Sequence, residues 1–231
     1  MIRRLRRLRR GLLVLDPQID FVSGTMPVPD AAVAIAHIVE HVEQEGRDYK
    51  AILVTQDWHR QPGGHFATNT GKPADLVESF PNHCIADTYG ALVVPELRKA
   101  CVGLGVRMFH KGEHSAGLSA FEATSASSGR FFSEVLDELA LDELVVCGMT
   151  IEYAVLSSVR HACERRLATR VLGDLSGVYR DRSSGVALAE MSALGAEIVG
   201  DRARELLALG ARALGAAGSS DEQPGKAVEA S

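Results

Sequence analysis

Short apolar runs of strand length alternate with longer amphipathic stretches along most of the chain. The runs predict strands at residues 12–15, 51–55, 106–109, 144–147, 170–172 and 197–199. Apolar residues at helical spacing predict helices within 30–46, 128–142, the residues after 153, 183–196 and 201–215. Because strands that alternate with helices pair in parallel through right-handed crossovers, we expect a three-layer α/β/α sandwich with a mostly parallel, doubly wound sheet.

The same pattern sets the expected domain boundaries. Residues 1–10 form a basic N-terminal lead-in with six arginines, and residues 11–213 form one domain. Residues 214–231 are low in hydrophobicity and predict a flexible C-terminal tail. Two polar, turn-rich stretches, 58–88 and 112–128, interrupt the alternation, and long loops of this kind tend to carry function.

Composition narrows the class of protein. The net charge is −5 at pH 7, with 24% charged and 46% hydrophobic residues, which is typical of a soluble globular protein and gives no global signal for nucleic acid. The arginines leave a nucleic-acid or membrane arm as the alternative to a solvated lead-in. No apolar stretch approaches the ~20 residues of a membrane span, and the start lacks the pattern of a signal peptide. We expect a cytoplasmic homo-oligomer that binds neither nucleic acid nor a membrane.

Two charged residues stand at predicted strand ends. Asp16 directly follows the first strand, and Lys111 comes at the end of "VRMFHK". The carboxyl ends of parallel strands are where reactive groups collect in open α/β sheets. An aspartate there can act in catalysis or hydrogen-bond a turn, and a single lysine can simply be solvated, so the two positions alone leave both interpretations open.

A second group of residues has the donor types of a metal site. Asp57 and His59 in "QDWHRQ" are alternate residues beyond a strand, so both side chains point to one side, and His83 follows in "PNHC". One aspartate and two histidines suit Zn²⁺, Fe²⁺ or Mn²⁺ with open positions for solvent or substrate, and a structural hydrogen-bond network is the alternative. His37 and His41 have i, i+4 spacing without a metalloprotease signature, and we expect no ligation there. Structural roles are expected for the other histidines, His65, His110, His114 and His161.

The stretch "VVCGMTIEYAVLSSVRHA", residues 145–162, reads as a strand, a turn at Gly148 and the start of a helix. Such a junction offers free N–H groups and suits a nucleophile, whose thiol would have a lowered pKa there. Position 154 is nevertheless alanine. The four cysteines, Cys84, Cys101, Cys147 and Cys163, lack CxxC spacing and are expected to be reduced and mostly buried.

Together these fragments resemble a known family. The motifs "LVLDPQIDF", "VTQDWH", "FPNHC" followed by "DTYGALVVPEL", "FHKGEHSAGLSAFEA" and "VVCGMTIEYAVLSSVRHA" have the order and spacing of the isochorismatase-like cysteine hydrolases, and look most like the metal-containing nicotinamidase branch. The resemblance covers about residues 11–200. It places the family's Asp–Lys–Cys triad on Asp16, Lys111 and Ala154, so the nucleophilic cysteine is missing.

The resemblance also implies how the rest of the site is built. One divalent transition metal, with zinc as the first choice and iron or manganese as alternatives, would be held by Asp57, His59 and His83. A cis peptide between Met149 and Thr150 would turn the N–H groups of Thr150 and Ala154 toward the substrate carbonyl as an oxyanion hole. Phe21 and Phe80 would form aromatic walls, with Phe80 in place of the family's usual tryptophan.

The implied activity is hydrolysis of the C–N bond of a small amide, nicotinamide to nicotinate plus ammonia as the first choice, here in an inactive Cys-to-Ala form. Because Asp16, Lys111 and the metal residues are retained, we expect a deliberate replacement rather than natural decay. Two alternatives stay open. One is a hydrolase of cyclic amides that resembles streptothricin hydrolase, and the other is a natural pseudoenzyme that binds a small amide or a partner protein without turnover.

Overall fold

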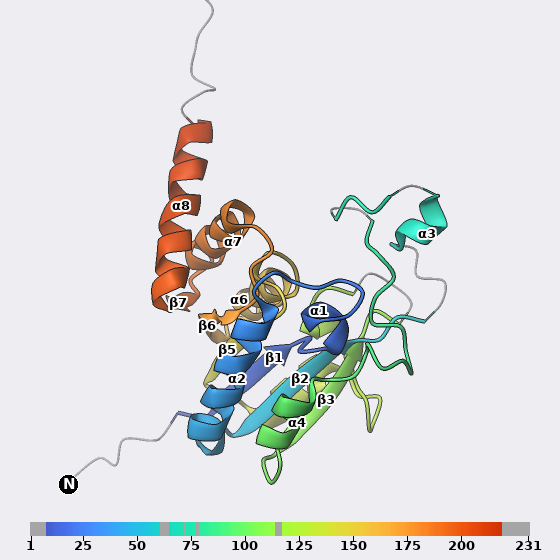
Figure 1. Ribbon diagram of the computed structural model, residues 1–231. Helices are drawn as coiled ribbons and strands as arrows, with labels where there is room; N and C mark the ends of the chain where they lie inside the picture. The colour runs from blue at the N-terminus through green and yellow to red at the C-terminus, as the bar shows by residue number, and fades with distance from the viewer. Residues whose placement is uncertain (1–7, 61–64, 72, 77–78, 114–116, 219–231) are drawn as a thin grey trace, which may run out of the picture.

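The computed structural model describes residues 8–60, 65–71, 73–76, 79–113 and 117–218, which form one seven-stranded sheet in the order β4-β3-β2-β1-β5-β6-β7 (Figure 1). Six strands pair in parallel: β1 (Arg10–Leu15), β2 (Ala51–Asp57), β3 (Val106–Lys111), β5 (Glu143–Gly148), β6 (Ala168–Ser176) and β7 (Glu197–Val199). The two-residue β4 (Thr124–Ser125) is antiparallel to β3. All six predicted strands are present, and the predicted mostly parallel sheet is confirmed.

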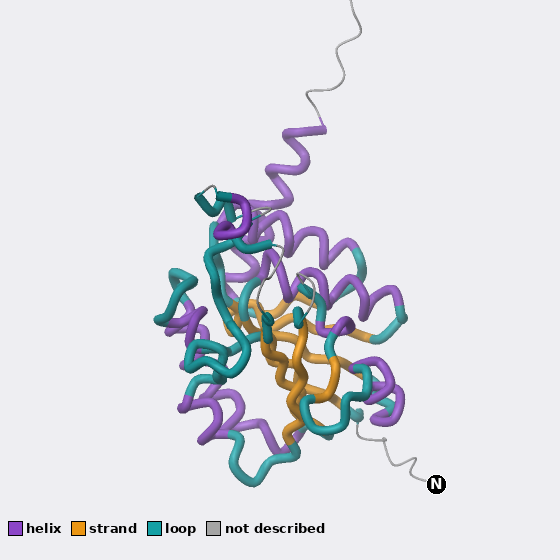
Figure 2. Tube along the Cα trace, turned by 90° about the vertical axis from the view of Figure 1, so that its right-hand side faces the viewer, coloured by secondary structure: helices purple, strands orange, loops and turns teal. Residues whose placement is uncertain are grey.

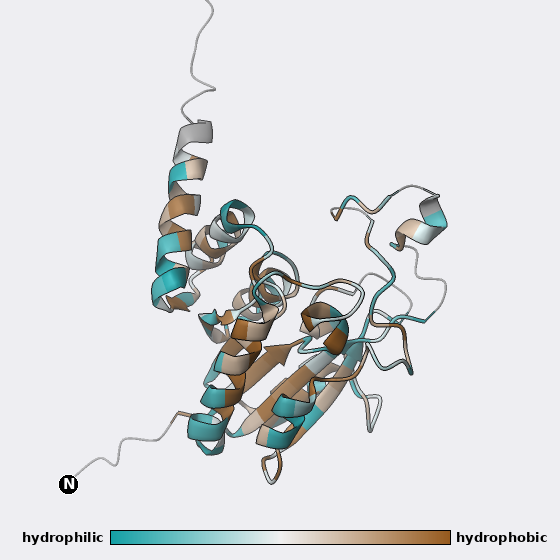
Figure 3. Cartoon of the chain, viewed as in Figure 1, coloured by the Kyte–Doolittle hydropathy of each residue, from teal (hydrophilic) through white to brown (hydrophobic). Residues whose placement is uncertain are grey.

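Helices cover both faces of the sheet, as the turned view in Figure 2 shows. One face carries α2 (Ala31–Glu45) and α4 (Pro95–Ala100). The other carries α5 (Phe132–Leu139), α6 (Leu156–Glu164), α7 (Asp181–Ala193) and α8 (Asp201–Gly218). Successive residues of β1 alternate between the two apolar cores, since Leu12 and Val14 belong to the first and Leu13 and Leu15 to the second. This explains why the central strands β1 and β2 contain continuous apolar runs, which are brown in Figure 3.

Several short elements lie outside the predicted pattern. They are α1 (Ile19–Val22), α3 (Ala67–Thr70), the 3₁₀ turns η1 (Gly46–Asp48) and η2 (Ala120–Glu122), and the π-helical turn η3 (Ile151–Val155). At the C-terminus, α8 continues to Gly218, five residues beyond the predicted domain boundary at 213. The rest of the predicted tail, and residues 1–7 of the lead-in, lie outside the described residues. Among the described helices, none is long and apolar enough to cross a membrane.

The strand order decides where the site lies. Strands β3, β2, β1 and β5 are consecutive neighbours, so their carboxyl ends meet at one edge of the sheet. In the strand register, Asp57 is level with Lys111, and Leu15 is level with Gly148. The charged residues and the junction predicted from the sequence are therefore brought together at this edge, as expected for an open α/β sheet.

Candidate active site

Lys111 lies between two carboxylates. Its Nζ is 2.8 Å from Asp16 Oδ2 and also contacts Asp57 Oδ1, and the side chains of Lys111 and Asp16 are each only 1% exposed. The hydroxyl of Thr55 donates to Asp16 Oδ1 at 2.7 Å, and the backbone N–H of Asp16 donates to Thr55 O at 3.2 Å. Asp16 is thereby held by Thr55 of β2 and by Lys111 at the end of β3. Because Lys111 is buried and paired, it is not the solvated lysine that the sequence left as an alternative.

Burial and the central lysine give the two carboxylates different acidities. Burial raises the pKa of Asp16 to about 6, although Lys111 partly opposes this. Burial also disfavours the charge on Asp57, but Lys111 and His59 outweigh it and lower the pKa of that carboxyl. For Lys111 the two carboxylates outweigh burial and raise its pKa. Near neutral pH, Asp57 and Lys111 are charged, and Asp16 has a pKa suited to moving a proton.

The junction after β5, hereafter the elbow (Gly148–Leu156), brings Ala154 to the same place. Gly148 has φ of +125°, and a Cβ there would lie 2.1 Å from Leu15 O, so glycine is required at the turn. The peptide between Met149 and Thr150 is cis, as the family resemblance implied. The π-helical turn η3 then leads into α6, and Ala154 within it is only 3% exposed. The Thr150 hydroxyl is buried and has no partner among the described residues.

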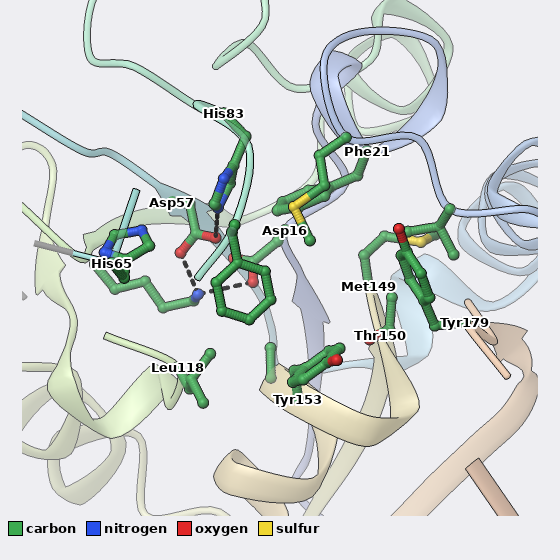
Figure 4. Close-up of a pocket in the computed structure, with 15 residues that line it drawn as sticks. Asp16, Phe21, Asp57, His65, His83, Leu118, Met149, Thr150, Tyr153 and Tyr179 are labelled. Carbon is green, nitrogen blue, oxygen red and sulfur yellow. Dashed lines mark hydrogen bonds and ion pairs between the residues drawn. The ribbon is translucent and has the colours of Figure 1, made fainter. Parts of the chain in front are cut away.

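One pocket collects most of the predicted residues (Figure 4). Its lining includes Asp16, Phe21, Asp57, Phe80, His83, Lys111, Thr150 and Ala154. It also includes residues that the sequence did not single out for this site: Met26, Val28, His65, Leu118, Tyr153 and Tyr179. His59 is not part of the lining, and it lies in the histidine group at the polar end of the pocket.

Three histidines and Asp57 form a compact donor group. Each of the three rings places one nitrogen within 4.8 Å of a nitrogen of the other two; the rings are those of His59, His65 and His83. Asp57 Oδ2 is 3.8 Å from His59 Nε2 and 3.9 Å from His83 Nε2, distances too long for hydrogen bonds. In the described part of the chain, His59 Nε2 and His65 Nε2 are buried without a partner. Buried imidazole nitrogens that face a carboxylate without bonding it fit the ligand set of a divalent transition metal.

The ring orientations support this fit. His59 Nδ1 lies 2.8 Å from Gly112 O and His83 Nδ1 lies 2.7 Å from Pro81 O, which leaves the Nε2 atoms of both rings to face Asp57. Burial lowers the pKa of His83 and lowers that of His65 to about 4, so these two rings are neutral and able to bind a metal near neutral pH. The structure places His65 in this donor group, whereas the sequence predicted only a structural role for it. The available signal was its place six residues after His59 in the same turn-rich loop.

Comparisons with known proteins agree with this geometry. A protein-family model described as the isochorismatase domain matches residues 10–202, and the chain belongs to this family. The chain is 31% identical over 190 residues to the nicotinamidase/pyrazinamidase of Mycobacterium tuberculosis, covering 82% of this chain and 98% of the relative. It is 30% identical over 205 residues to the nicotinamidase of Escherichia coli, and this match covers 82% of this chain and 93% of the relative.

Solved structures show the same fold. The pyrazinamidase of Pyrococcus horikoshii in complex with zinc superimposes with a TM-score of 0.70 at 25% identity, covering 84% of this chain and 99% of that one. The yeast nicotinamidase bound to the inhibitor nicotinaldehyde superimposes with a TM-score of 0.72 at 24% identity. The match covers 83% of this chain and 100% of the yeast chain. The predicted membership of the isochorismatase-like hydrolases is therefore confirmed.

Proposed function

We propose that the protein binds a small amide of the nicotinamide class in a site built for C–N hydrolysis, in a form that lacks the attacking thiol. The observation that carries the proposal is the contact of Lys111 with Asp16 in the same pocket as Ala154. A base, an ammonium group and the start of a helical segment surround a position where only a methyl group stands. The nicotinamidases that match at 30–31% identity favour this substrate class.

The chain's own residues have distinct roles in the reaction that a thiol at position 154 would start. Asp16 takes the thiol proton and later delivers it to the departing amine, and Lys111 stabilises the thiolate. The N–H groups of Thr150 and Ala154 donate to the carbonyl oxygen as negative charge develops on it. Because alanine has no attacking atom, the present chain stops at the bound amide.

The donor group at the polar end of the pocket would hold one divalent metal ion, zinc as the first choice, through Asp57, His59 and His83, with His65 as an additional ligand. Such an ion would bind and orient a ring nitrogen of the substrate. Phe21 and Phe80 then serve as walls for a flat ring. Phe21 lies 5.5 Å from His83 between ring centroids, and Phe80 meets Tyr153 edge to face at 5.8 Å. The cytoplasmic location and the homo-oligomer stay predictions.

The substitution Ala154→Cys tests the proposal. We expect the substituted, metal-loaded protein to release ammonia from nicotinamide, while the original chain releases none above background. The control Ala100→Cys places a new thiol at the end of α4, away from the pocket, and should stay inactive. Pyrazinamide and simple lactams assayed in parallel separate an aromatic amidase from a cyclic-amide hydrolase. If Ala154→Cys binds nicotinamide but hydrolyses no amide, the triad assignment is wrong.

A further inference from the structure

Tyr153, the residue before Ala154, is hydrogen-bonded to the loop that follows β2. Its hydroxyl donates to the carbonyl oxygen of Leu76 at 2.7 Å, a contact between residues 77 positions apart in the chain. Both Tyr153 and Ala154 line the pocket. A side chain of the elbow therefore fastens a loop segment that is distant in sequence, directly beside the position of the missing nucleophile.

Leu76 is connected to its surroundings by hydrogen bonds. Leu76 has φ of +59° and donates its N–H to Ser79 O at 2.9 Å. Asp75 and Ser79 bond each other twice, since the N–H of Asp75 donates to Ser79 Oγ at 3.2 Å and the N–H of Ser79 donates to Asp75 Oδ1 at 2.9 Å. A displacement of Leu76 would therefore move Ser79 as well.

Ser79 leads directly to residues of the site. The next residue, Phe80, donates its N–H to His65 O at 2.9 Å, and Ala67 donates its N–H to Phe80 O at 2.8 Å. Phe80 also packs edge to face on the ring of Tyr153. The hydrogen bond from Tyr153 is thus linked through a short series of bonds to one aromatic wall and to one histidine of the donor group.

We propose that Tyr153 is a positioning residue whose hydroxyl holds this loop against the elbow, and that the hydrogen bond limits access to position 154. The inference rests on the proposed function only in taking this pocket as the ligand site, and it requires no turnover. A neutral hydrogen bond typically contributes enough stability for its loss to raise the population in which the loop has moved away roughly 2- to 10-fold.

Access to the pocket can be measured with iodoacetamide on the Ala154→Cys protein, with Tyr153→Phe added as the test change. Mass spectrometry follows alkylation at position 154, and the partly exposed Cys101 serves as an internal reference for reagent strength. We expect Tyr153→Phe to raise the alkylation rate at position 154 roughly 2- to 10-fold. The factor should be the same at every pH, whereas a changed thiol pKa would shift the rate profile along the pH axis.

Tyr49→Phe is the matched control. The Tyr49 hydroxyl also makes a side-chain hydrogen bond, 2.8 Å to His41 Nε2, and Tyr49 does not line the pocket. It should leave the alkylation rate at position 154 unchanged. Amide hydrogen exchange at Leu76, Ala67 and Phe80 in the single variants gives a second readout, and it should accelerate in Tyr153→Phe only.

Unchanged alkylation with Tyr153→Phe overturns the proposal, whether or not exchange accelerates, because access would then not depend on the hydroxyl. A shift of the profile along the pH axis overturns it too, since the effect would lie in the thiol. Both readouts are independent of amide hydrolysis. Failure of Ala154→Cys to release ammonia would therefore count against the proposed function without deciding this inference.

Discussion

The pocket has two halves that differ in the functional groups they provide. The donor half, Asp57, His59, His65 and His83, brings one nitrogen from each of three imidazole rings within 4.8 Å of one another and places Asp57 Oδ2 3.8 Å from His59 Nε2 and 3.9 Å from His83 Nε2. The elbow half, Asp16, Thr150 and Ala154, has a buried carboxylate and the start of a helical segment, and position 154 carries only a methyl group. Lys111 belongs to both halves because it contacts Asp16 and Asp57. Under the proposed function, the donor half holds the ligand, whereas the elbow half cannot form a covalent bond to it.

This difference separates two properties that usually coincide in a hydrolase. Under the proposed function, ground-state binding depends on the donor half and the aromatic walls, whereas bond formation would depend on a thiol at position 154. On this proposal, a methyl group at that position stops covalent chemistry and leaves the binding groups in place. The two halves should therefore respond differently to substitution, and the following predictions test that independence from the largest expected effect to the smallest.

The largest effect is expected from adding Asp16→Asn to the Ala154→Cys protein. An amide cannot take the thiol proton, so the ammonia-release rate gained by the thiol should fall by about 10²–10⁴. Asp137→Asn, at an exposed ion pair with Arg165, is the control and should leave the rate unchanged. Full activity in the double variant would show that Asp16 is not the base.

Lys111→Met should cost about 3–5 kcal/mol of unfolding free energy in metal-free protein, because it leaves two buried carboxylates without their common counter-charge. Lys50→Met removes a lysine that donates to Leu139 O at 2.9 Å from a more exposed position, and it should cost only about 1 kcal/mol. Urea unfolding of both variants makes the comparison. Equal losses would mean that Lys111 is not the electrostatic centre of the pocket.

His65→Ala should weaken metal binding by about 100-fold, or roughly 2.7 kcal/mol, because it removes a ligand atom rather than an outer partner. His37→Ala is the control, since His37 lies on α2 with Nδ1 3.0 Å from Asp174 O and outside the donor group. Competition with a chelator gives the affinities, and elemental analysis of the parent protein should find about one ion per chain. A metal affinity of His65→Ala equal to that of the control would remove His65 from the ligand set.

The smallest effect concerns pH. Since the folded-state pKa of Asp16 is raised from 3.8 to about 6, the native state binds more protons between these values, and this group lowers stability as pH rises through that window. Asp57 has the opposite effect, because its pKa is lowered in the folded state. Its charged form stabilises the fold at pH values above the ordinary aspartate pKa, and this contribution is lost as the pH falls below that pKa. Unfolding of metal-free Asp16→Asn from pH 4 to 6 should therefore show a more positive slope than the parent, by at most about 1.4 kcal/mol per pH unit. Parallel slopes would contradict the raised pKa.

The sequence predicted the parts of this molecule that depend on local pattern. The six parallel strands followed from apolar runs. The strand-end positions of Asp16 and Lys111 were visible in the sequence but left their roles open, and the family resemblance singled out these two residues and position 154. The donor types of Asp57, His59 and His83 were visible in short motifs. Each of these features is decided within about ten residues of chain.

Features that depend on the path of the loops could not be predicted in this way. His65 reaches His83 because the loop folds back through the bridge between Phe66 and Phe80, which no local pattern indicates. The bond from Tyr153 to Leu76 joins distant segments, and β4 is only two residues long and carries no periodicity. These are tertiary contacts that the strand order alone does not determine.

Calorimetry of the unaltered, metal-loaded chain with nicotinamide, followed by mass analysis of the bound fraction, tests most directly whether the pocket binds an amide without cleaving it. We predict saturable binding at one site per chain and recovery of intact nicotinamide after prolonged incubation. Recovery of nicotinate above the protein-free background would contradict the account, because it would show that a nucleophile other than a side chain at position 154 acts in this pocket. Absence of any binding would equally contradict it, because the donor half would then not hold the ligand.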